Sequence, residues 1–377
     1  MRKSLYATTL AFTVLVLLLW YNPSNRQQAA VQAAVNPMPA ACIPPSHVGS
    51  SPEQTAWQLF VASTCPVNAN QYPYIVWENW IEQGQLYGAG AAQALAVGGR
   101  PRFHMSPLAK VMREKAKGAL HPEAVLPTGA NEDCNSQTWS GRTICEEARL
   151  NPSAQDYVTS NSLTTLNGQV AFITAGKAFD FTPPSVELKA DWIQYPLATC
   201  TNPPAGVHVE TVAGSCYALG GIHLISKLID KWIWATFEPQ NSLTNPQRCV
   251  VLGCNDPWGS VPARSSGKPT KQSQVLAQLM KDANLAAEWR NYRLDGVQVD
   301  FVDAAGKATV LGNSVIEGDN AGNPTLMKSS SCITCHDLST INTSKQQLSP
   351  DFIIGPPKSI PAGYVRRDFV WSLSLAQ

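Results

Sequence analysis

The clearest pattern of apolar and polar positions in the chain lies at residues 186–192. In Val186-Glu187-Leu188-Lys189-Ala190-Asp191-Trp192, apolar and charged residues alternate without a break. This alternation has the period of a half-buried β-strand. Charged residues on the outward face of such a strand are usually solvated, so we expect Glu187 and Lys189 to face solvent.

Other segments predict an α+β fold, a β-rich single body with N-terminal helices. The pattern predicts strands at residues 168–174, a hairpin of 217–225 with 232–237, and a second hairpin of 297–302 with 308–311. Helices are expected from Ser51 and Pro52 onward, at 105–117 and at 272–289, with a loop-rich segment at 118–155. Six tryptophans at apolar-periodic positions are expected in the core: Trp57, Trp77, Trp80, Trp192, Trp232 and Trp234.

The amino terminus resembles an export signal. Arg2 and Lys3 precede an apolar run at residues 5–20, and small residues follow at 29–34. We therefore expect a signal peptide at 1–33, a linker at 34–52 and the globular domain at 53–377. The alternative is an uncleaved anchor, in which case the protein would be held at the membrane.

Charge excludes one class of partner. Without residues 1–33 the chain keeps 25 bases (28 less Arg2, Lys3 and Arg26) against 27 acids. A balance near neutrality without a basic tract argues against nucleic-acid binding.

The motif Cys332-Ile333-Thr334-Cys335-His336 indicates a cofactor. Cys-x-x-Cys-His is the attachment site of c-type haem, in which the two thiols form thioethers and the histidine binds iron. Ten cysteines and six histidines in random order would give about 0.004 copies of it. The alternatives are a structural disulfide or a thioredoxin-like pair, but no βαβ pattern surrounds the motif.

The other eight cysteines predict disulfide bonds, as is typical of an exported chain. Their spacing favours pairing between near neighbours, although eight cysteines allow 105 connectivities. The expected pairs are Cys42–Cys65, Cys134–Cys145, Cys200–Cys216 and Cys249–Cys254. Metal binding is the alternative for Cys249 and Cys254.

The position of the motif limits the kind of cytochrome. Only 41 residues follow His336, and none is His or Met, so a distal iron ligand has to come from upstream. His223 in its apolar strand is the first candidate, against the alternative of a hydrogen-bonded core histidine. Met105 and Met327 are weaker candidates, and an open distal site is a further alternative.

The distal ligand separates the function classes. A six-coordinate haem indicates an electron carrier, whereas an open site favours peroxide or gas chemistry. Peroxidase-type catalysis wants an acid–base group near the iron, for which Glu187 and Lys189 are formally available. A structural or partner-binding protein stapled by haem is a third class. Electron transfer is the leading expectation, with no catalytic residue assigned and enzyme activity left open.

The chain also resembles a family, the exported bacterial single-haem proteins labelled cytochrome c family protein. The resemblance rests on segments spread over most of the chain: residues 56–60, 76–80, 186–192, 221–223, 232–238, 311–313, 330–336 and 368–372. It implies one covalent haem c in a segment at 329–345, a periplasmic location and periplasmic redox partners. Residues 62–66, Ala-Ser-Thr-Cys-Pro, stand where the family pattern has Leu-Asn-Trp-Pro. A disulfide at Cys65 is therefore expected to be peculiar to this chain.

Overall fold

An antiparallel sheet forms the centre of the molecule, with the strand order β1-β3-β4-β6-β7-β12. Strand β2 pairs antiparallel with the start of β3, and β5 pairs with β6. The strands of this sheet are β1 (Ile81–Glu82), β2 (Thr138–Trp139), β3 (Arg142–Leu150), β4 (Val186–Tyr195), β5 (Val209–Val212), β6 (Ser215–Ser226), β7 (Ile233–Pro239) and β12 (Tyr292–Gln298). Three short pairs lie outside it: β8 (Cys254–Asn255) with β10 (Arg264–Ser265), β9 (Ser260–Val261) with β11 (Lys271–Gln272), and β13 (Thr340–Asn342) with β14 (Tyr364–Arg366).

The computed structural model describes residues 38–67, 75–87, 138–139, 142–212, 214–240, 248–266, 268–317, 324–350, 353–357 and 359–376. The segment Ala40–Gln377 groups into one unit. Its α-helices are α3 (Pro52–Thr64), α4 (Gln83–Tyr87), α6 (Pro152–Ser160), α7 (Leu166–Thr174), α8 (Ala198–Thr201), α9 (Arg248–Val251), α10 (Gln274–Asp282), α12 (Pro324–Ser329) and α13 (Cys332–His336). Short 3-10 turns are η1 (Ala40–Cys42), η2 (Trp77–Asn79), η4 (Trp289–Asn291) and η5 (Trp371–Leu375).

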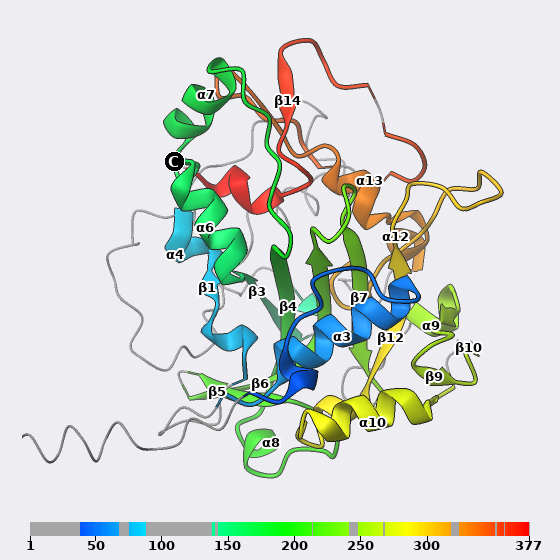
Figure 1. Cartoon of the computed structure of the whole chain (residues 1–377). Helices are drawn as coiled ribbons and strands as arrows, with labels where there is room; N and C mark the ends of the chain where they lie inside the picture. Colours follow the sequence, from blue (N-terminus) through cyan, green and yellow to red (C-terminus); the bar gives the residue numbers. More distant parts are fainter. Residues whose placement is uncertain are drawn as a thin grey trace, which may run out of the picture. The chain divides into compact units, whose positions relative to one another are not determined.

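An apolar cluster occupies the middle of the first face of the sheet, and the charged pair Glu147 and Arg149 lies on the same face in β3. The register aligns Leu188 of β4 with Leu224 of β6, Ala235 of β7 and Val297 of β12, and all four belong to one hydrophobic cluster. Helix α3 packs on β6, β7 and β12, and α10 packs on α3 (Figure 1). Burying these side chains supplies the main driving force for this half of the fold.

The second face of the sheet carries the polar half of the alternation. A row across it runs from Leu150 of β3 through Glu187 of β4, Ile225 of β6 and Trp234 of β7 to Gln298 of β12. Leu150, Ile225 and Trp234 belong to a second hydrophobic cluster with residues of α6, α7, α13 and the C-terminal segment. Helices α6 and α7 and the C-terminal third of the chain therefore cover this face together.

Residues 168–174, expected as a strand, belong to helix α7, so that prediction was wrong. The Thr165 side chain accepts a hydrogen bond from the Gly168 backbone N–H and caps the helix start. Gln169 and Phe172, three residues apart, are its buried positions. A short apolar run fits either element, and here the cap decides for the helix.

The loop-rich prediction for residues 118–155 was also wrong where the structure describes this segment. Strand β3 occupies Arg142–Leu150, and α6 begins at Pro152 with Asn151 as its cap, accepting from the Ala154 N–H. The helix expected at 105–117 lies outside the described residues, as do residues 1–37 and 118–137.

Several other predictions are confirmed. Helix α3 begins at Pro52 with Ser51 as the N-cap, β4 follows the alternation at 186–192, and β6 and β7 form the expected antiparallel hairpin. The expected helix at 272–289 is shorter, because α10 ends before Asn284, which has a positive φ of 52°. In the last hairpin only a single bridge, Val302 to Ala308, forms. The six tryptophans are all buried.

Disulfide bonds tie the described chain at three of the expected places. They join Cys42 to Cys65, Cys200 to Cys216 and Cys249 to Cys254. Cys145 is also disulfide-bonded, and its expected partner Cys134 lies outside the described residues. Cys249 and Cys254 therefore form a disulfide and not the metal site that was the alternative.

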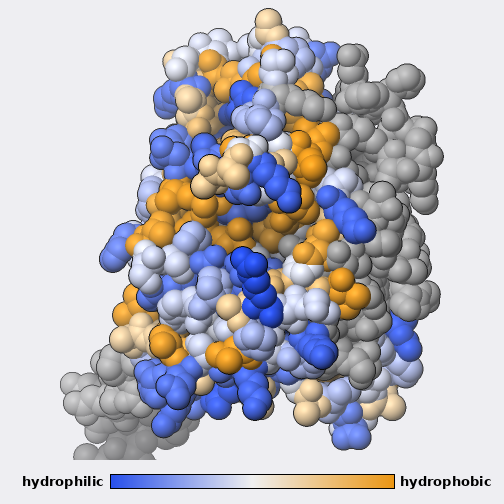
Figure 2. Space-filling view, turned by 90° about the vertical axis from the view of Figure 1, so that its right-hand side faces the viewer, coloured by the Kyte–Doolittle hydropathy of each residue, from blue (hydrophilic) through white to orange (hydrophobic). Residues whose placement is uncertain are grey.

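One side of the molecule shows apolar residues gathered in a band between hydrophilic regions (Figure 2). Helix α9 and strand β9, which lie at this side in Figure 1, carry the well-exposed Val250 and Val261. Among the residues that the structure describes, no helix combines the length and apolar character that crossing a membrane requires.

Candidate functional site

The helical turn α13, which carries the Cys-x-x-Cys-His motif, is fastened to the end of strand β12. The Gln298 side chain donates to the Ser331 hydroxyl at 3.0 Å and accepts from the Ile333 N–H at 3.3 Å. A parallel bridge joins Leu311 to Ser331, just before the turn. The motif is therefore held against the second face of the sheet by two segments that are distant from it in sequence.

A cavity lies between this turn and the second face of the sheet. It encloses about 690 Å³ when the open space at its mouth is included. Its walls combine apolar side chains with a few ionisable ones. The lining residues are Glu187, Lys189, His223, Ile225, Trp234, Ala235, Glu317, Ser330, Ser331, Cys332, Cys335 and His336.

His336 has the hydrogen bond that a metal-binding histidine usually makes. Its Nδ1 lies 2.7 Å from the carbonyl oxygen of Phe369, and because a carbonyl only accepts, Nδ1 carries the proton and donates. The lone pair of the neutral ring is then on Nε2. Burial lowers the pKa of His336 to about 3, so the ring is neutral at physiological pH. The Trp234 ring packs against it edge-on at 4.6 Å between centroids.

The carbonyl that holds His336 belongs to an unusual backbone turn. Asp368 and Phe369 have positive φ angles of 52° and 67°, a region that non-glycine residues seldom occupy. Contacts on both sides hold the turn, because the Asp368 carboxylate accepts from the Phe181 N–H and from Lys227 Nζ, each at 2.7 Å. Backbone strain of this kind persists where surrounding structure enforces it and is common at functional sites.

The two motif cysteines remain thiols, unlike the disulfide-bonded cysteines elsewhere. Both line the cavity, and burial raises the pKa of the Cys332 thiol well above its usual value. The Trp371 indole donates to the Cys335 carbonyl at 3.2 Å and holds the middle of the turn. Haem c is attached through two cysteine thiols and bound at its iron by a histidine. This helical turn carries those three groups beside a partly apolar cavity, so the residues present fit haem c.

His223 lies in the same cavity, on strand β6. Its Nε2 contacts both carboxylate oxygens of Glu317, at 2.9 and 3.1 Å. Since the carboxylate accepts, Nε2 donates, and Nδ1 is the ring nitrogen that Glu317 does not engage. That buried Nδ1 has no hydrogen-bond partner in the described structure. Although burial acts in the opposite direction, His223 lowers the pKa of Glu317.

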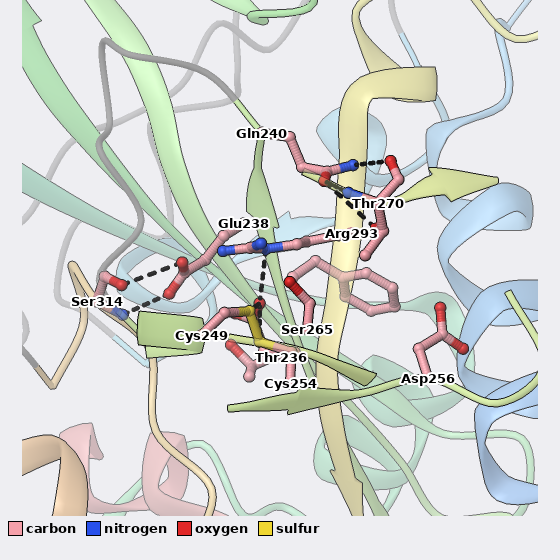
Figure 3. Close-up of polar contacts among 12 residues, drawn as sticks. Thr236, Glu238, Gln240, Cys249, Cys254, Asp256, Ser265, Thr270, Arg293 and Ser314 are labelled. Atoms are coloured by element: carbon pink, nitrogen blue, oxygen red, sulfur yellow. Dashed lines mark hydrogen bonds and ion pairs between the residues drawn. A yellow bond between two sulfur atoms is a disulfide. The ribbon is translucent and has the colours of Figure 1, made fainter. Parts of the chain in front are cut away.

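Glu317 is positioned by a segment that lies on the second face of the sheet. The Ser314 hydroxyl donates to Glu238 of β7 at 3.0 Å (Figure 3), and the Asn313 side chain donates to the Thr236 hydroxyl at 3.0 Å. Asn313 also donates its backbone N–H to Glu317 at 2.6 Å. Gly221 leaves room for this segment, because a Cβ there would lie 2.5 Å from the Asn313 side-chain oxygen.

Glu187 and Lys189 line the cavity and do not form a solvated face, so that expectation was wrong. Burial raises the pKa of the Glu187 carboxyl to about 7, and the Ser372 hydroxyl, which donates to it at 3.0 Å, opposes the rise. Lys189 forms an ion pair with Glu146 at 2.7 Å. The C-terminal segment that contains Ser372 covers these charges, and the alternation in β4 could not reveal that cover.

A second, smaller hollow adjoins the first. It encloses about 380 Å³ and shares Glu187, Lys189 and His336 with it. Its other walls come from β3 and from the C-terminal residues Trp371, Ser372, Ser374 and Leu375 among others. The three shared side chains therefore separate an apolar-sided space from a more polar one.

Other histidines and methionines upstream of the motif have different surroundings. Met327 is fully buried on α12 but does not line the cavity, and His208 lies in another cluster. His104, Met105, Met112 and His121 lie outside the described residues. Among the described candidates, His223 is the one that the fold brings to the same cavity as His336.

Three residues that the sequence did not single out complete the site: Trp234, Gln298 and Phe369. Trp234 was expected only as a core residue, and its contact with the His336 ring depends on the register of the hairpin of β6 and β7. Phe369 acts through its backbone carbonyl, which leaves no side-chain signal in the sequence. Gln298 lies in a segment of alternating apolar and polar residues, and that pattern gives no sign of its contact with the motif.

Comparison with known proteins adds no relative. No family model matches the chain, and neither a curated protein nor a solved structure matches it. What fold and site define is thus a class: a disulfide-bonded protein of mixed helix and sheet, with a Cys-x-x-Cys-His turn lining a cavity on the sheet.

Proposed function

We propose that the chain is an exported c-type haem protein that transfers electrons. The observation that carries the proposal is the hydrogen bond from His336 Nδ1 to the Phe369 carbonyl, beside two thiols in one cavity. It leaves Nε2 as the proximal iron ligand, with Cys332 and Cys335 as covalent anchors. The disulfides favour an oxidising compartment such as the periplasm, where the redox partners are proteins.

Haem c would supply a one-electron couple at its iron. The residues of this chain would hold and tune it. The Phe369 carbonyl increases the basicity of His336 and fixes the ring, and Trp234 keeps it oriented. The apolar side chains of Ile225 and Ala235 exclude water from one part of the cavity wall.

His223 is our candidate for the distal ligand. Glu317 accepts a hydrogen bond from its Nε2, as outer carboxylates do from the ligating histidines of many metal sites. Its Nδ1 has no hydrogen-bond partner among the described residues and is the nitrogen that remains for iron. A six-coordinate iron of this kind binds external ligands poorly and suits electron transfer.

A haem oxidoreductase with an open distal site is the second candidate. Two observations favour it: Glu317 already holds His223, and the Glu187 carboxyl has a pKa near neutrality and lines the cavity. A buried acid of that pKa is suited to deliver and accept protons beside a bound peroxide. Glu187 would then be the acid–base group.

Spectroscopy of the purified, haem-loaded protein tests both functions. For the carrier we expect low-spin spectra in both oxidation states and little change on adding carbon monoxide to the reduced form. Ready binding of carbon monoxide would contradict the carrier and support the open site. Absence of a haem spectrum from the exported protein would contradict both.

The His223→Ala variant tests the distal ligand. We expect it to convert the low-spin spectrum to high spin and to open the iron to carbon monoxide. Met327→Leu, a buried variant away from the cavity, serves as the control and should leave the spectrum unchanged. An unchanged spectrum in His223→Ala would remove His223 as the ligand.

A further inference from the structure

A second group of potential metal ligands lies apart from the motif, at the start of strand β5. Its members are Glu78 of η2, His208 and Glu210. The His208 Nε2 lies 3.3 Å from an oxygen of Glu78 and 3.7 Å from an oxygen of Glu210. We propose that these three side chains bind one divalent transition-metal ion of the Zn²⁺ type, independently of any haem.

The separations between the donor atoms also suit coordination of an ion. Without an ion, His208 Nε2 is hydrogen-bonded to Glu78 at 3.3 Å, and its contact with Glu210 at 3.7 Å is too long for a hydrogen bond. Zinc binds nitrogen and oxygen at about 2.0–2.1 Å, and two ligands at tetrahedral angles are then about 3.4 Å apart. The measured 3.3 and 3.7 Å lie on either side of that separation.

The fold holds the three donors in place. His208 and Glu210 are two residues apart on an extended segment, so their side chains leave from the same side. The His208 ring packs against Trp289, with centroids 4.4 Å apart, and against Trp192 at 5.6 Å. Glu78 is almost fully buried, and its second oxygen accepts from the Ile75 N–H at 3.3 Å. Little side-chain freedom would be lost on binding an ion.

Negative charge is in excess around the group. Glu78, Glu210 and Glu288 all lie within electrostatic reach of His208. Glu82 and Glu147 also lie within electrostatic reach of this region, and Arg149 is engaged by Glu147 at 2.6 Å. A divalent cation would balance charges that are costly to bury uncompensated.

The donor set also indicates the kind of ion. One imidazole with two carboxylates suits zinc and its first-row neighbours, whereas calcium and magnesium prefer oxygen ligands alone. Glu210 keeps 21% of its side chain exposed and His208 12%, so solvent reaches the site. With three protein ligands, water would complete the coordination of the ion.

Calorimetric titration with Zn²⁺ tests the proposal on the haem-loaded full chain after treatment with chelator and removal of any affinity tag. We expect one saturable site per chain, with an affinity that falls at least about ten-fold in Glu210→Gln and is lost in His208→Ala. The matched control is His47→Ala, which removes an exposed histidine that contacts only Ser46 Oγ. X-ray absorption at the zinc edge should show one imidazole among light-atom ligands.

Two results would overturn the proposal: no saturable zinc binding by the wild type, or unchanged affinity in both Glu210→Gln and His208→Ala. If His208→Ala fails to fold, as shown by its near-ultraviolet circular dichroism, Glu210→Gln decides alone, because Glu210 is partly exposed and its loss leaves the Trp packing intact. Equal weakening in His47→Ala would also contradict the assignment, since zinc would then be bound at the surface.

Discussion

The two faces of the central sheet are formed by the same strands but differ in what covers them and in the side chains that they bury. On the first face, Leu188, Leu224 and Phe237 belong to one apolar cluster with residues of α3 and α10, and the buried charges there, Glu147 and Arg149, are paired with each other at 2.6 Å. On the second face, Glu187 and His223 are covered by the C-terminal segment and border a cavity. The first face therefore stabilises the fold, whereas the second keeps ionisable groups buried at a cost that a binding site explains.

The difference shows what alternation along a strand can teach. A period of two identifies the residues that share a face, and it did so correctly for β4. It does not reveal what covers each face. In this chain the cover of the second face includes Ser372, which lies 185 positions after Glu187 in the sequence and donates to its carboxylate.

The largest effect is expected on the first face, in Phe237→Ala. Phe237 is fully buried and packs against Trp57 and Phe60, with centroids 5.0 and 4.5 Å apart. The cavity left by its loss should lower the free energy of unfolding by about 3–5 kcal/mol. Urea unfolding followed by tryptophan fluorescence measures the change.

The control for that variant is Val275→Ala on the exposed side of α10, which should change the free energy of unfolding by less than about 0.5 kcal/mol. A loss below about 1 kcal/mol in Phe237→Ala would mean that the first face is not the main core.

A pH-dependent effect of opposite sign is expected on the second face, in Glu187→Gln. Because burial raises the folded-state pKa of Glu187 to about 7, its contribution to stability is present below pH 4.5 and is lost as pH rises through 7. The glutamine cannot ionise and can still accept from Ser372. At pH 8 the variant should therefore be more stable than the wild type, by as much as about 3 kcal/mol.

Urea unfolding between pH 4 and pH 8 checks this sign. The two proteins should converge near pH 4, and Asp156→Asn, an exposed change on α6, should follow the wild type throughout. A variant that is less stable than the wild type at pH 8 would show that the Glu187 carboxylate is stabilised where it lies.

A smaller effect is expected in Gln298→Ala, which releases the motif turn from the second face. The variant loses the bonds to Ser331 and Ile333 and leaves both groups buried without that partner. The expected loss is about 1–3 kcal/mol. Hydrogen exchange of the Ile333 and Cys335 amides should accelerate while the amides of α3 keep their rates, and equal acceleration of both would mean that the whole fold is loosened.

Local signals in the sequence predicted the elements with clear caps or periods. The Ser51–Pro52 start of α3, the strand at 186–192 and the hairpin of β6 with β7 were all predicted correctly. The disulfides between near neighbours followed from short spacing. The run at 168–174 was wrongly predicted as a strand, because a short apolar-rich segment fits a buried strand or a helix equally well.

The candidate site was predicted in part. The sequence identified Cys332, Cys335, His336 and His223, and the fold brings all four to one cavity. It could not supply the Phe369 carbonyl, because a backbone acceptor is independent of the residue type. The environment of Glu187 depends on tertiary cover and was predicted wrongly for that reason.

The most direct test of the central claim is the mass of the exported chain after complete denaturation. The account predicts a mass increased by that of one haem, located by proteolysis on the peptide that contains Cys332 and Cys335. Replacing both cysteines by alanine should abolish the increase, whereas replacing Cys200 and Cys216, a disulfide pair elsewhere, should leave it. A wild-type chain without the added mass, with its motif cysteines as thiols or joined as a disulfide, would contradict the account.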